Sequence, residues 1–536
     1  MPPIRLTFLL AVILVGFCPI PGLAQDYFFD GDAGPDEVGS YLLLDFDVPD
    51  GTTRIDVAYS YENAGDGSGG TSSPLAGLLD DVIDIGLYDP DGFRGWSGSN
   101  KSAFSVALSA EATTPSYVPG PIPVGAWQVE LGVGWVNPGH MLHYAVTVSL
   151  SSDDVGPTFE PPYLVPIVLS GERRWYKGDL HCHSEHSDGA PMADVFEYAH
   201  SRGLDFVALT DHNTVSHTLF IPEYQDLYPD MLLLYGIEVT TYRGHANALG
   251  VASYVDYHGT APGYDVNAVI DRVHALGGLF SPNHPNQPVI PLHGSYYGWG
   301  WGFPETDWSR VDSLEAINGP SRIAGTIPNP LNTLAIRRWD GLQDEGFRVP
   351  LRGGSDDHQA GQGSGPTYSP IGSPTTVVYA DELSAAGIYD GLRAGRAFVM
   401  TEGPDGPEVY LSAASDDRSA IVGETIGGDD VRVSARVLRG AGMRLVVLRD
   451  GEAWRQVEDL PSDDEVVEIS EPIEAPCRVR AEVYDGSILK VITNSIFVET
   501  GADDDTGDDD TSGDDADDDG SADANDAGRS ESGCGC

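Results

Sequence analysis

The sequence is poor in cysteine, with five in 536 residues. Cys18 lies in an apolar N-terminal segment, and the other four are too few and too widely spaced for a disulfide framework. After this segment the chain also lacks any run of about 18 apolar residues, the length that a membrane-spanning helix needs. We therefore expect a mature chain with no transmembrane segment and no disulfide scaffold.

Basic residues are scarce as well. The chain has 29 Lys and Arg against 83 Asp and Glu, a net charge of −54, and part of the excess lies in the Asp-rich segment 502–532. A surface this acidic repels phosphate backbones and anionic lipids. Neither nucleic acid nor a bare membrane is expected as a partner. The hydrophobic fraction of 41% is ordinary for a globular protein and excludes a mainly disordered or fibrous chain.

The N-terminus has the pattern of an export signal. Arg5 precedes the apolar run Leu6–Phe17, and Gly22-Leu23-Ala24 offers a small-residue cleavage site. Cys18 would suit a lipoprotein signal, but the bulky Phe17 precedes it, so cleavage after Ala24 is the favoured interpretation. This predicts a periplasmic, extracellular or cell-surface protein of unknown oligomeric state.

Composition changes along the chain predict several domains. Short strand-like runs with turn residues between them favour β-sandwiches near both ends, whereas strands alternate with helical segments in the middle. The predicted strands there are 206–209, 232–235, 279–281 and 349–352, and the helices are 192–202, 266–276 and 332–345. The predicted organisation is a signal peptide (1–24), a β-sandwich (25–155), a linker (156–174), a parallel α/β sheet or barrel (175–404), a second β-sandwich (405–500) and a disordered acidic tail (501–536).

Histidines concentrate in the middle segment. Twelve of the fourteen lie between His181 and His358. The first two form a His-x-His pair at the end of a predicted strand, and since strand side chains alternate, both imidazoles share one face. Further His, Asp and Glu residues follow other predicted strands, namely Asp211-His212, Glu238, His245, His284 and Asp356-Asp357-His358.

A single histidine after a strand is more often a hydrogen-bonded loop residue than a metal ligand. Ligand-type residues at five strand ends of one segment are harder to explain in that way, because these ends converge at one face of a parallel barrel. A set of His, Asp and Glu without Cys suits Zn, Mn or Fe. The sequence therefore predicts a centre that binds divalent metal ions.

These motifs resemble those of the polymerase and histidinol phosphatase (PHP) superfamily. The matching segments are His181-x-His183, Ser187-Asp188-Gly189, Thr210-Asp211-His212-Asn213, Gly236-Ile237-Glu238, Asn283-His284-Pro285 and Gly354-Ser355-Asp356-Asp357-His358. Three further segments resemble the CehA/McbA-type metallohydrolases, namely Gly244-His245-Ala246-Asn247-Ala248-Leu249-Gly250, Glu315-Ala316-Ile317-Asn318-Gly319 and Gly395-Arg396-Ala397-Phe398 with Gly403-Pro404.

The resemblance implies a distorted, TIM-like (β/α)7 barrel with two or three divalent metal ions. His181, His183, Glu238 and Asp356 would hold the first ion. Glu238 would also bridge to a second ion, completed by His245 and His284, and Asp188, His212 and His358 would hold a third. The spacing from Glu238 to His245 is shorter than in many phosphatases of the superfamily.

Three more residues are candidates for roles in catalysis. Arg396 or Arg243 could neutralise charge that develops on an anionic ester, and His186 could orient the substrate. Arg396 could equally pin a loop by pairing with a carboxylate. Asp211 is expected to orient a ligand histidine rather than bind metal.

The expected function is that of an exported metal-dependent hydrolase that uses a metal-activated hydroxide. A phosphomono- or diester on a small molecule or a polymer is the leading substrate. A carboxyl or carbamate ester hydrolysed by the same centre is the first alternative. The second is a non-catalytic surface module that binds glycan or protein while the central domain is structural.

Overall fold

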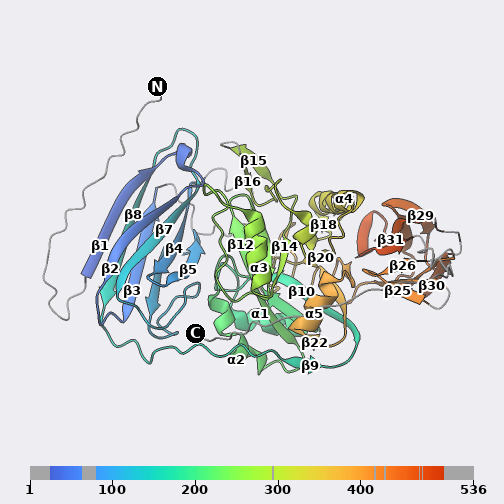
Figure 1. Cartoon of the computed structure of the whole chain (residues 1–536), viewed down its shortest axis with the longest axis horizontal. Coiled ribbons are helices and arrows are strands. Elements are labelled where there is room, and N and C mark those ends of the chain that lie inside the picture. The colour runs from blue at the N-terminus through green and yellow to red at the C-terminus, as the bar shows by residue number, and fades with distance from the viewer. Residues whose placement is uncertain are drawn as a thin grey trace, which may run out of the picture. The chain divides into compact units, whose positions relative to one another are not determined.

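The structure is a computed structural model, and Figure 1 shows its ribbon. It describes residues 25–62, 80–292, 295–415, 418–427, 430–469, 471, 473 and 475–499, without the side chains of 25 and 290–297. The predicted signal peptide and the predicted acidic tail lie outside these residues. Within them, no helix has the length and apolar character needed to cross a membrane.

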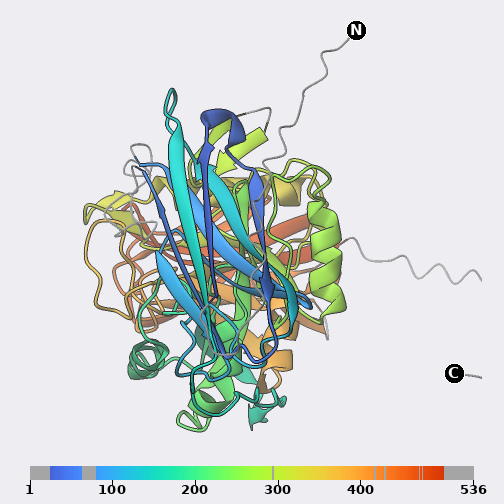
Figure 2. The same cartoon turned by 90° about the vertical axis from the view of Figure 1, so that its left-hand side faces the viewer.

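The N-terminal segment forms two four-stranded antiparallel sheets (Figure 2). Inward residues such as Ile55, Leu87, Val129 and Val148 are fully or almost fully buried in one shared core. They alternate with outward residues because strand side chains have a period of two. Short strands separated by turns, as the sequence pattern of this segment predicted, form both sheets. One sheet has the order β1 (Gln25–Ala33), β8 (Leu142–Ser151), β3 (Arg54–Tyr61), β6 (Ala103–Ala107), and the other β2 (Tyr41–Val48), β7 (Gly125–Trp135), β4 (Val82–Asp89), β5 (Gly92–Gly98).

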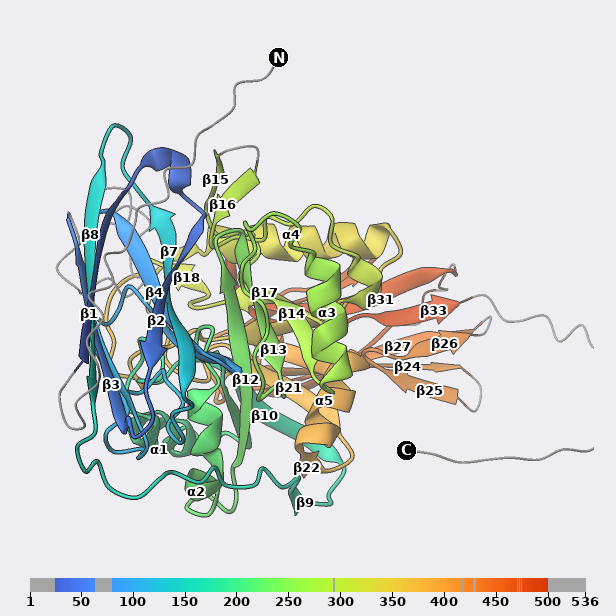
Figure 3. The ribbon, with the colours of Figure 1, turned by 60° about the vertical axis from the view of Figure 1, so that its left-hand side comes forward.

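The middle segment is built on one long mixed sheet (Figure 3). Its central strands β10, β11 and β12 are parallel, and the strands on either side pair antiparallel. The order is β14 (Leu279–Pro282), β13 (Gly244–Leu249), β12 (Leu232–Thr241), β11 (Phe206–Leu209), β10 (Arg174–Cys182), β21 (Thr375–Ala380), β23 (Ala397–Met400). Shorter pairs are β17 (Leu314–Asn318) with β20 (Leu351–Gly354), β15 (Val289–Leu292) with β16 (Ser295–Gly298), β18 (Arg322–Ile323) with β19 (Ile327–Pro328), and β9 (Val168–Ser170) with β22 (Leu383–Ser384).

The predicted (β/α)7 barrel is wrong for this structure. The described residues contain only five α-helices, and the long sheet runs on into C-terminal strands instead of closing. A tight turn joins β12 to β13 where a barrel would need a crossover helix. The three predicted helices are confirmed, because each begins and ends within two residues of its expected position. The helices are α1 (Met192–Ser201), α2 (Ile221–Gln225), α3 (Val266–Ala275), α4 (Pro330–Asp344) and α5 (Ala385–Arg393).

The C-terminal segment has one sheet of its own and shares the other with the middle segment. Strand β23 pairs with β32, so the long sheet crosses the expected boundary at residue 404. The two layers enclose a core that includes Val433, Val447 and Val479. The shared layer continues as β32 (Ile488–Thr493), β31 (Cys477–Asp485), β28 (Arg444–Arg449), β29 (Glu452–Val457), and β33 (Ile496–Glu499) pairs with β31 on one side and β26 (Thr425–Gly427) on the other. The separate layer is β25 (Arg418–Ile421), β24 (Glu408–Ser415), β27 (Arg432–Leu438), β30 (Asp464–Ile469).

Candidate metal centre

The carboxyl ends of the parallel strands carry the predicted ligands. His181 is the penultimate residue of β10, His183 follows that strand, and His212 comes three residues after β11. Glu238 lies within β12, and its backbone bridges to His212 in parallel register. Because neighbouring parallel strands end at the same edge of a sheet, these side chains meet there.

The structure brings eight of the nine predicted ligands into three overlapping clusters. In each cluster the potential ligand atoms lie within 4.8 Å of one another. Three residues, His183, His212 and Glu238, each belong to two clusters and make the centre compact. The clusters are His181, His183, Glu238 and Asp356; His183, Asp188, His212 and His358; and His212, Glu238 and His245.

The ninth predicted ligand, His284, lies directly beside them. Its Nε2 is 3.2 Å from Glu238 Oε1, and its ring centroid is 5.0 Å from that of His245. His284 and Asp356 both have positive φ, at 27° and 57°. Non-glycine residues hold such backbone conformations at a cost of about 1–3 kcal/mol and cluster at functional sites.

The β12–β13 hairpin explains the short spacing between Glu238 and His245. His245 pairs with Thr240, two residues from Glu238, so both side chains share one face of the sheet. His245 Nδ1 lies 3.2 Å from Glu238 Oε1. The tight turn thus places His245 beside Glu238 despite the short spacing between the two residues.

Several buried polar atoms in these clusters have no hydrogen-bond partner. They include both carboxylate oxygens of Asp188 and one of Glu238, together with the Nε2 atoms of His181, His212 and His358. Buried polar groups are nearly always hydrogen-bonded, and leaving one unpaired costs about 1–3 kcal/mol. Cations at these positions would satisfy all six atoms, so the residues fit a set of divalent metal ions.

The electrostatics of the clusters are dominated by burial and by close opposite charges. Burial alone would raise the pKa of Asp188, but the charges of His358 and His212 outweigh it and hold that pKa far below its usual value. Burial would lower the pKa of His358, yet Asp188 raises it to about 10. Burial and the neighbouring His358 and His212 lower the pKa of His183 to about 4. Asp188 is thus ionised and His183 is neutral near pH 7, the protonation states that metal coordination requires of a carboxylate and an imidazole.

A buried ion pair holds His181 in place. Glu315 and Arg352 are both fully buried, and Arg352 Nη1 lies 2.9 Å from Glu315 Oε1. The same oxygen is 2.9 Å from His181 Nδ1, which directs Nε2 towards Glu238 and Asp356. A Cβ at Gly354 would come within 2.4 Å of Glu315 Oε1, so glycine is required there.

Sequence reasoning assigned no role to this pair. Glu315 entered only as part of a motif, and Arg352 only as the end of a predicted strand. The sequence signal that could have identified them is one acidic residue inside one apolar strand and one basic residue inside another. Such residues are almost never fully buried unless they are paired.

Asp211 is linked through Ser187 to another histidine of the clusters, His183, and its role of orienting a ligand stays a prediction. It accepts hydrogen bonds from the Ser184 amide and the Ser187 hydroxyl, at 2.8 and 2.7 Å. Ser187 Oγ in turn lies 3.4 Å from His183 Nδ1. This chain fixes the ring of His183 with Nε2 towards the clusters.

The N-terminal sandwich reaches the loop that carries Asp188. Lys101 Nζ donates to the carbonyls of Ser187 and Glu185 at 2.7 and 3.2 Å and to Ser116 Oγ at 2.9 Å. These three bonds use all three ammonium donors. Lys101 was not among the predicted site residues.

Neither Arg396 nor Arg243 is placed as the sequence predicted. Arg396 lies far from the clusters, and the guanidinium of Arg243 is engaged elsewhere. Arg396 lies opposite Tyr379, which pairs with Trp175, six residues before His181 on β10. At about 3.3 Å per residue this is a separation of roughly 20 Å. Arg243 Nη2 donates to Gly302 O and Glu305, and its guanidinium stacks on Phe303.

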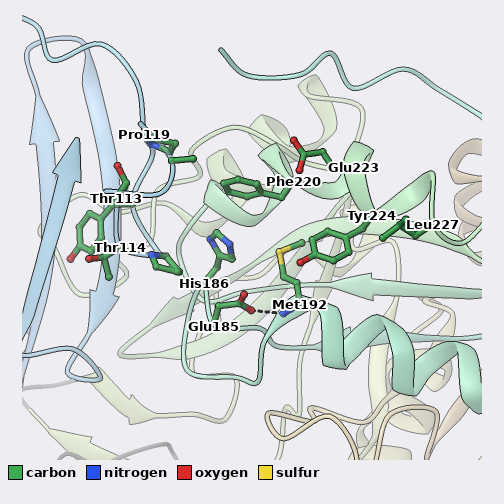
Figure 4. A pocket seen from close by; sticks show the side chains of 13 residues that line it. Thr113, Thr114, Pro119, Glu185, His186, Met192, Phe220, Glu223, Tyr224 and Leu227 are labelled. Carbon is green, nitrogen blue, oxygen red and sulfur yellow. Dashed lines mark hydrogen bonds between the residues drawn. The ribbon is translucent and has the colours of Figure 1, made fainter. Parts of the chain in front are cut away.

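His186 lies on the same loop as Asp188 and lines a cavity of about 530 Å³ (Figure 4). Its Nδ1 is 2.7 Å from Ser216 Oγ. Burial lowers its pKa to about 3, so the ring is neutral at pH 7. Phe220 and Tyr224 line the cavity from one side, and Thr113 and Thr114 of the N-terminal sandwich line it from the other.

Comparison with known proteins gives little beyond this geometry. No family model matches the chain, and no curated protein matches it significantly. One solved structure with some likeness is a two-domain protein from Bacteroides vulgatus ATCC 8482, described as containing a predicted PHP-like metal-dependent phosphoesterase. It is 20% identical, covers 64% of this chain and 99% of its own, and has a TM-score of 0.35. A TM-score this low does not establish a shared fold.

Proposed function

We propose that this protein is a metal-dependent hydrolase of phosphate esters, of the CehA/McbA type within the PHP superfamily. The observation that carries the proposal is the set of three overlapping clusters of His, Asp and Glu with unpaired buried atoms. We further propose that the chain is exported, on the pattern of its first 24 residues.

Two or three divalent ions held by these residues would lower the pKa of a bound water and polarise the ester. The chain's own groups prepare that chemistry. Glu315 and the Asp211–Ser187 pair direct the Nε2 atoms of His181 and His183 inward. Asn283 Nδ2 donates to Glu238 Oε1 at 2.8 Å and fixes the shared carboxylate.

His186 is proposed to orient the substrate. Its position two residues before Asp188 and its neutral ring suit a hydrogen bond to a substrate oxygen. The cavity beside it offers aromatic and apolar surface for the rest of an ester. Arg243 and Arg396 are left out of this proposal because of where their side chains lie.

The test is turnover of a panel of phosphomono- and diesters with Zn, Mn or Fe, by the wild-type chain and by His183→Ala. His183 belongs to two clusters, so its loss is expected to lower kcat/KM by at least about a thousandfold and to reduce bound metal. His200→Ala is the matched control, because His200 is exposed and its side chain contacts Asp230 and the ring of Tyr228, which belong to none of the clusters. Phosphoesterase activity that survives His183→Ala would reject the site.

The same panel includes carboxyl and aryl carbamate esters. Hydrolysis of these without any phosphate ester would replace the proposed substrate class and keep the centre. Stoichiometric metal with no hydrolysis of any ester would instead favour a binding module.

A further inference from the structure

A second cavity, of about 450 Å³, lies between three loops and the end of α1. Its lining combines proline and glycine residues with basic and hydroxyl-bearing side chains. It includes the guanidinium-bearing residues Arg202 and Arg322 and the hydroxyl residues Ser321, Ser369, Ser373 and Thr401. Clustered basic and hydroxyl groups are a setting for anions.

Arg202 is a cation without an acidic partner. It follows α1 directly, and in the described part of the chain no carboxylate forms an ion pair with it, although acidic residues outnumber basic ones almost three to one. Its Nη2 donates to Ser373 Oγ at 3.3 Å, and its Nε is shielded from water with no hydrogen-bond partner. An arginine side chain has five N–H donors, so most of this one's capacity is unused.

Gly403 allows the guanidinium to lie in this position. Its φ is +110°, and a Cβ there would stand 2.5 Å from Arg202 Nη2 and 2.9 Å from Ser373 Oγ. Any other residue at 403 would displace both groups. Gly403, which follows the lining residue Glu402, therefore determines where two lining side chains can lie.

The one acidic residue of the lining is already neutralised. Glu402 Oε1 lies 3.2 Å from Arg322 Nη2 and accepts a hydrogen bond from Ser321 Oγ at 3.0 Å. Its other oxygen binds Lys490 Nζ. Since one carboxylate faces two cations, the charge of Arg202 is left uncompensated.

Hydrogen bonds tie the cavity to the metal centre. The backbone amide of Gly372, beside Ser373, donates to Asp179 at 2.7 Å, and Asp179 also accepts from the amide of His181. Another lining residue, Pro320, follows Asn318 by two residues, and Asn318 Nδ2 lies 3.4 Å from Asp356 Oδ2. Residues beside the cavity lining thus make hydrogen bonds to candidate ligands or to residues next to them.

We propose that this cavity binds a second anionic group of the substrate, a carboxylate, sulfate or phosphate, while the scissile ester lies at the metal centre. Arg202 supplies the main charge, and Arg322 and the hydroxyls complete the contacts. The assignment of the cavity to a substrate rests on the proposed function, whereas the binding of an anion in the cavity does not. It narrows the substrate class to esters with two separated anionic groups.

The anion site is tested by calorimetric titration of the full chain with inorganic phosphate. Arg202→Met is expected to weaken one phosphate site by about tenfold or more, the value of a charge-assisted hydrogen bond. His183→Ala is expected to keep that site, because it alters only the metal clusters. Arg173→Met is the matched control, since Arg173 is exposed and paired with Asp381.

The side chain of Arg322 is half-exposed, so Arg322→Met is expected to weaken the same phosphate site less than Arg202→Met does. This second variant still tests the site if Arg202→Met fails to fold. Phosphate binding that is lost in His183→Ala and unchanged in both arginine variants would overturn the proposal. So would a wild-type chain with no phosphate site outside the metal centre.

A second experiment tests whether the cavity binds part of the substrate, by comparing the KM values for phenyl phosphate and 4-carboxyphenyl phosphate. Arg202→Met is expected to raise the ratio of the KM for the carboxylated ester to that for the plain ester by about tenfold. An unchanged ratio would overturn the assignment of the cavity to substrate. If neither ester is hydrolysed, the proposed function fails, and the phosphate titration still decides whether the cavity binds anions.

Discussion

Replacing Glu315 by Gln tests whether the buried ion pair organises the metal centre. Glu315 is not in any of the three clusters, yet both of its oxygens are engaged. Oε1 contacts His181 and Arg352, and Oε2 accepts from the backbone amide of His284 and from Asn318, at 2.9 and 3.1 Å. Glutamine keeps the size of the side chain and removes its charge.

Two effects of different size follow. Arg352 stays fully buried without its carboxylate, and breaking a buried pair in this way costs about 3–5 kcal/mol of stability. Glutamine keeps only one acceptor oxygen, so either His181 or the backbone amide of His284 faces an NH₂ group instead, and the loss of such a partner weakens metal binding by about 10–100-fold. Burial would raise the pKa of Glu315, but His181 and Arg352 hold it below its usual value, so the carboxylate is ionised at neutral pH.

The assay has two readouts on Glu315→Gln. Urea unfolding of the metal-free chain measures stability, and competition with a chelator measures the affinity of each bound ion. We expect one site to weaken by 10–100-fold. Glu197→Gln is the control, because Glu197 is exposed on α1.

The reasoning would be refuted by a variant that binds every ion with wild-type affinity. A loss of stability below about 0.5 kcal/mol, the range of ordinary surface substitutions, would show separately that the pair is not what stabilises this region.

Two further predictions concern contacts of the N-terminal sandwich. Burial would lower the pKa of His258, but hydrogen bonds to Asp256 and Glu130 raise it to about 9. The stability that the protonated ring gives to the folded state is therefore fully present below about pH 6.5 and is lost as the pH rises through 9. His258→Gln should therefore remove on the order of 2–3 kcal/mol of the stability difference between pH 6.5 and 9.5, measured by urea unfolding, and an unchanged pH slope would contradict this. Lys101→Met should release the loop that carries Asp188 and weaken one metal ion by about tenfold in a chelator titration, whereas unchanged affinity would mean that the loop holds its shape alone.

Much of the candidate site could be predicted from the sequence because its ligands follow strands. The position of a strand end is a local property, and α1, α3 and α4 also began and ended close to their predicted residues. The residue types at these ends, His, Asp and Glu, indicated metal binding before any geometry was known. All nine predicted ligands lie in the three clusters or, in the case of His284, beside them.

The sequence could not determine how the sheet ends. Strand–helix alternation favours a barrel, but whether strands close on themselves or pair with a later segment depends on contacts far apart in the chain. Here β23 pairs with β32, about ninety residues later, and a turn replaces a crossover helix between β12 and β13. Pattern alone cannot weigh such alternatives, because each strand is apolar on both faces in either arrangement.

The sequence by itself determined the chemistry of this protein: an acidic chain with one concentration of histidines and carboxylates placed after strands. The tertiary structure decided which charged residues are partners. It paired Glu315 with Arg352, brought Lys101 of the N-terminal sheets to the loop of Asp188, and placed Arg396 away from the clusters. It also left Arg202 unpaired beside a cavity. The reason is physical, since hydrogen bonds and ion pairs act over a few ångströms, and only folding brings residues that are distant in the chain within that range.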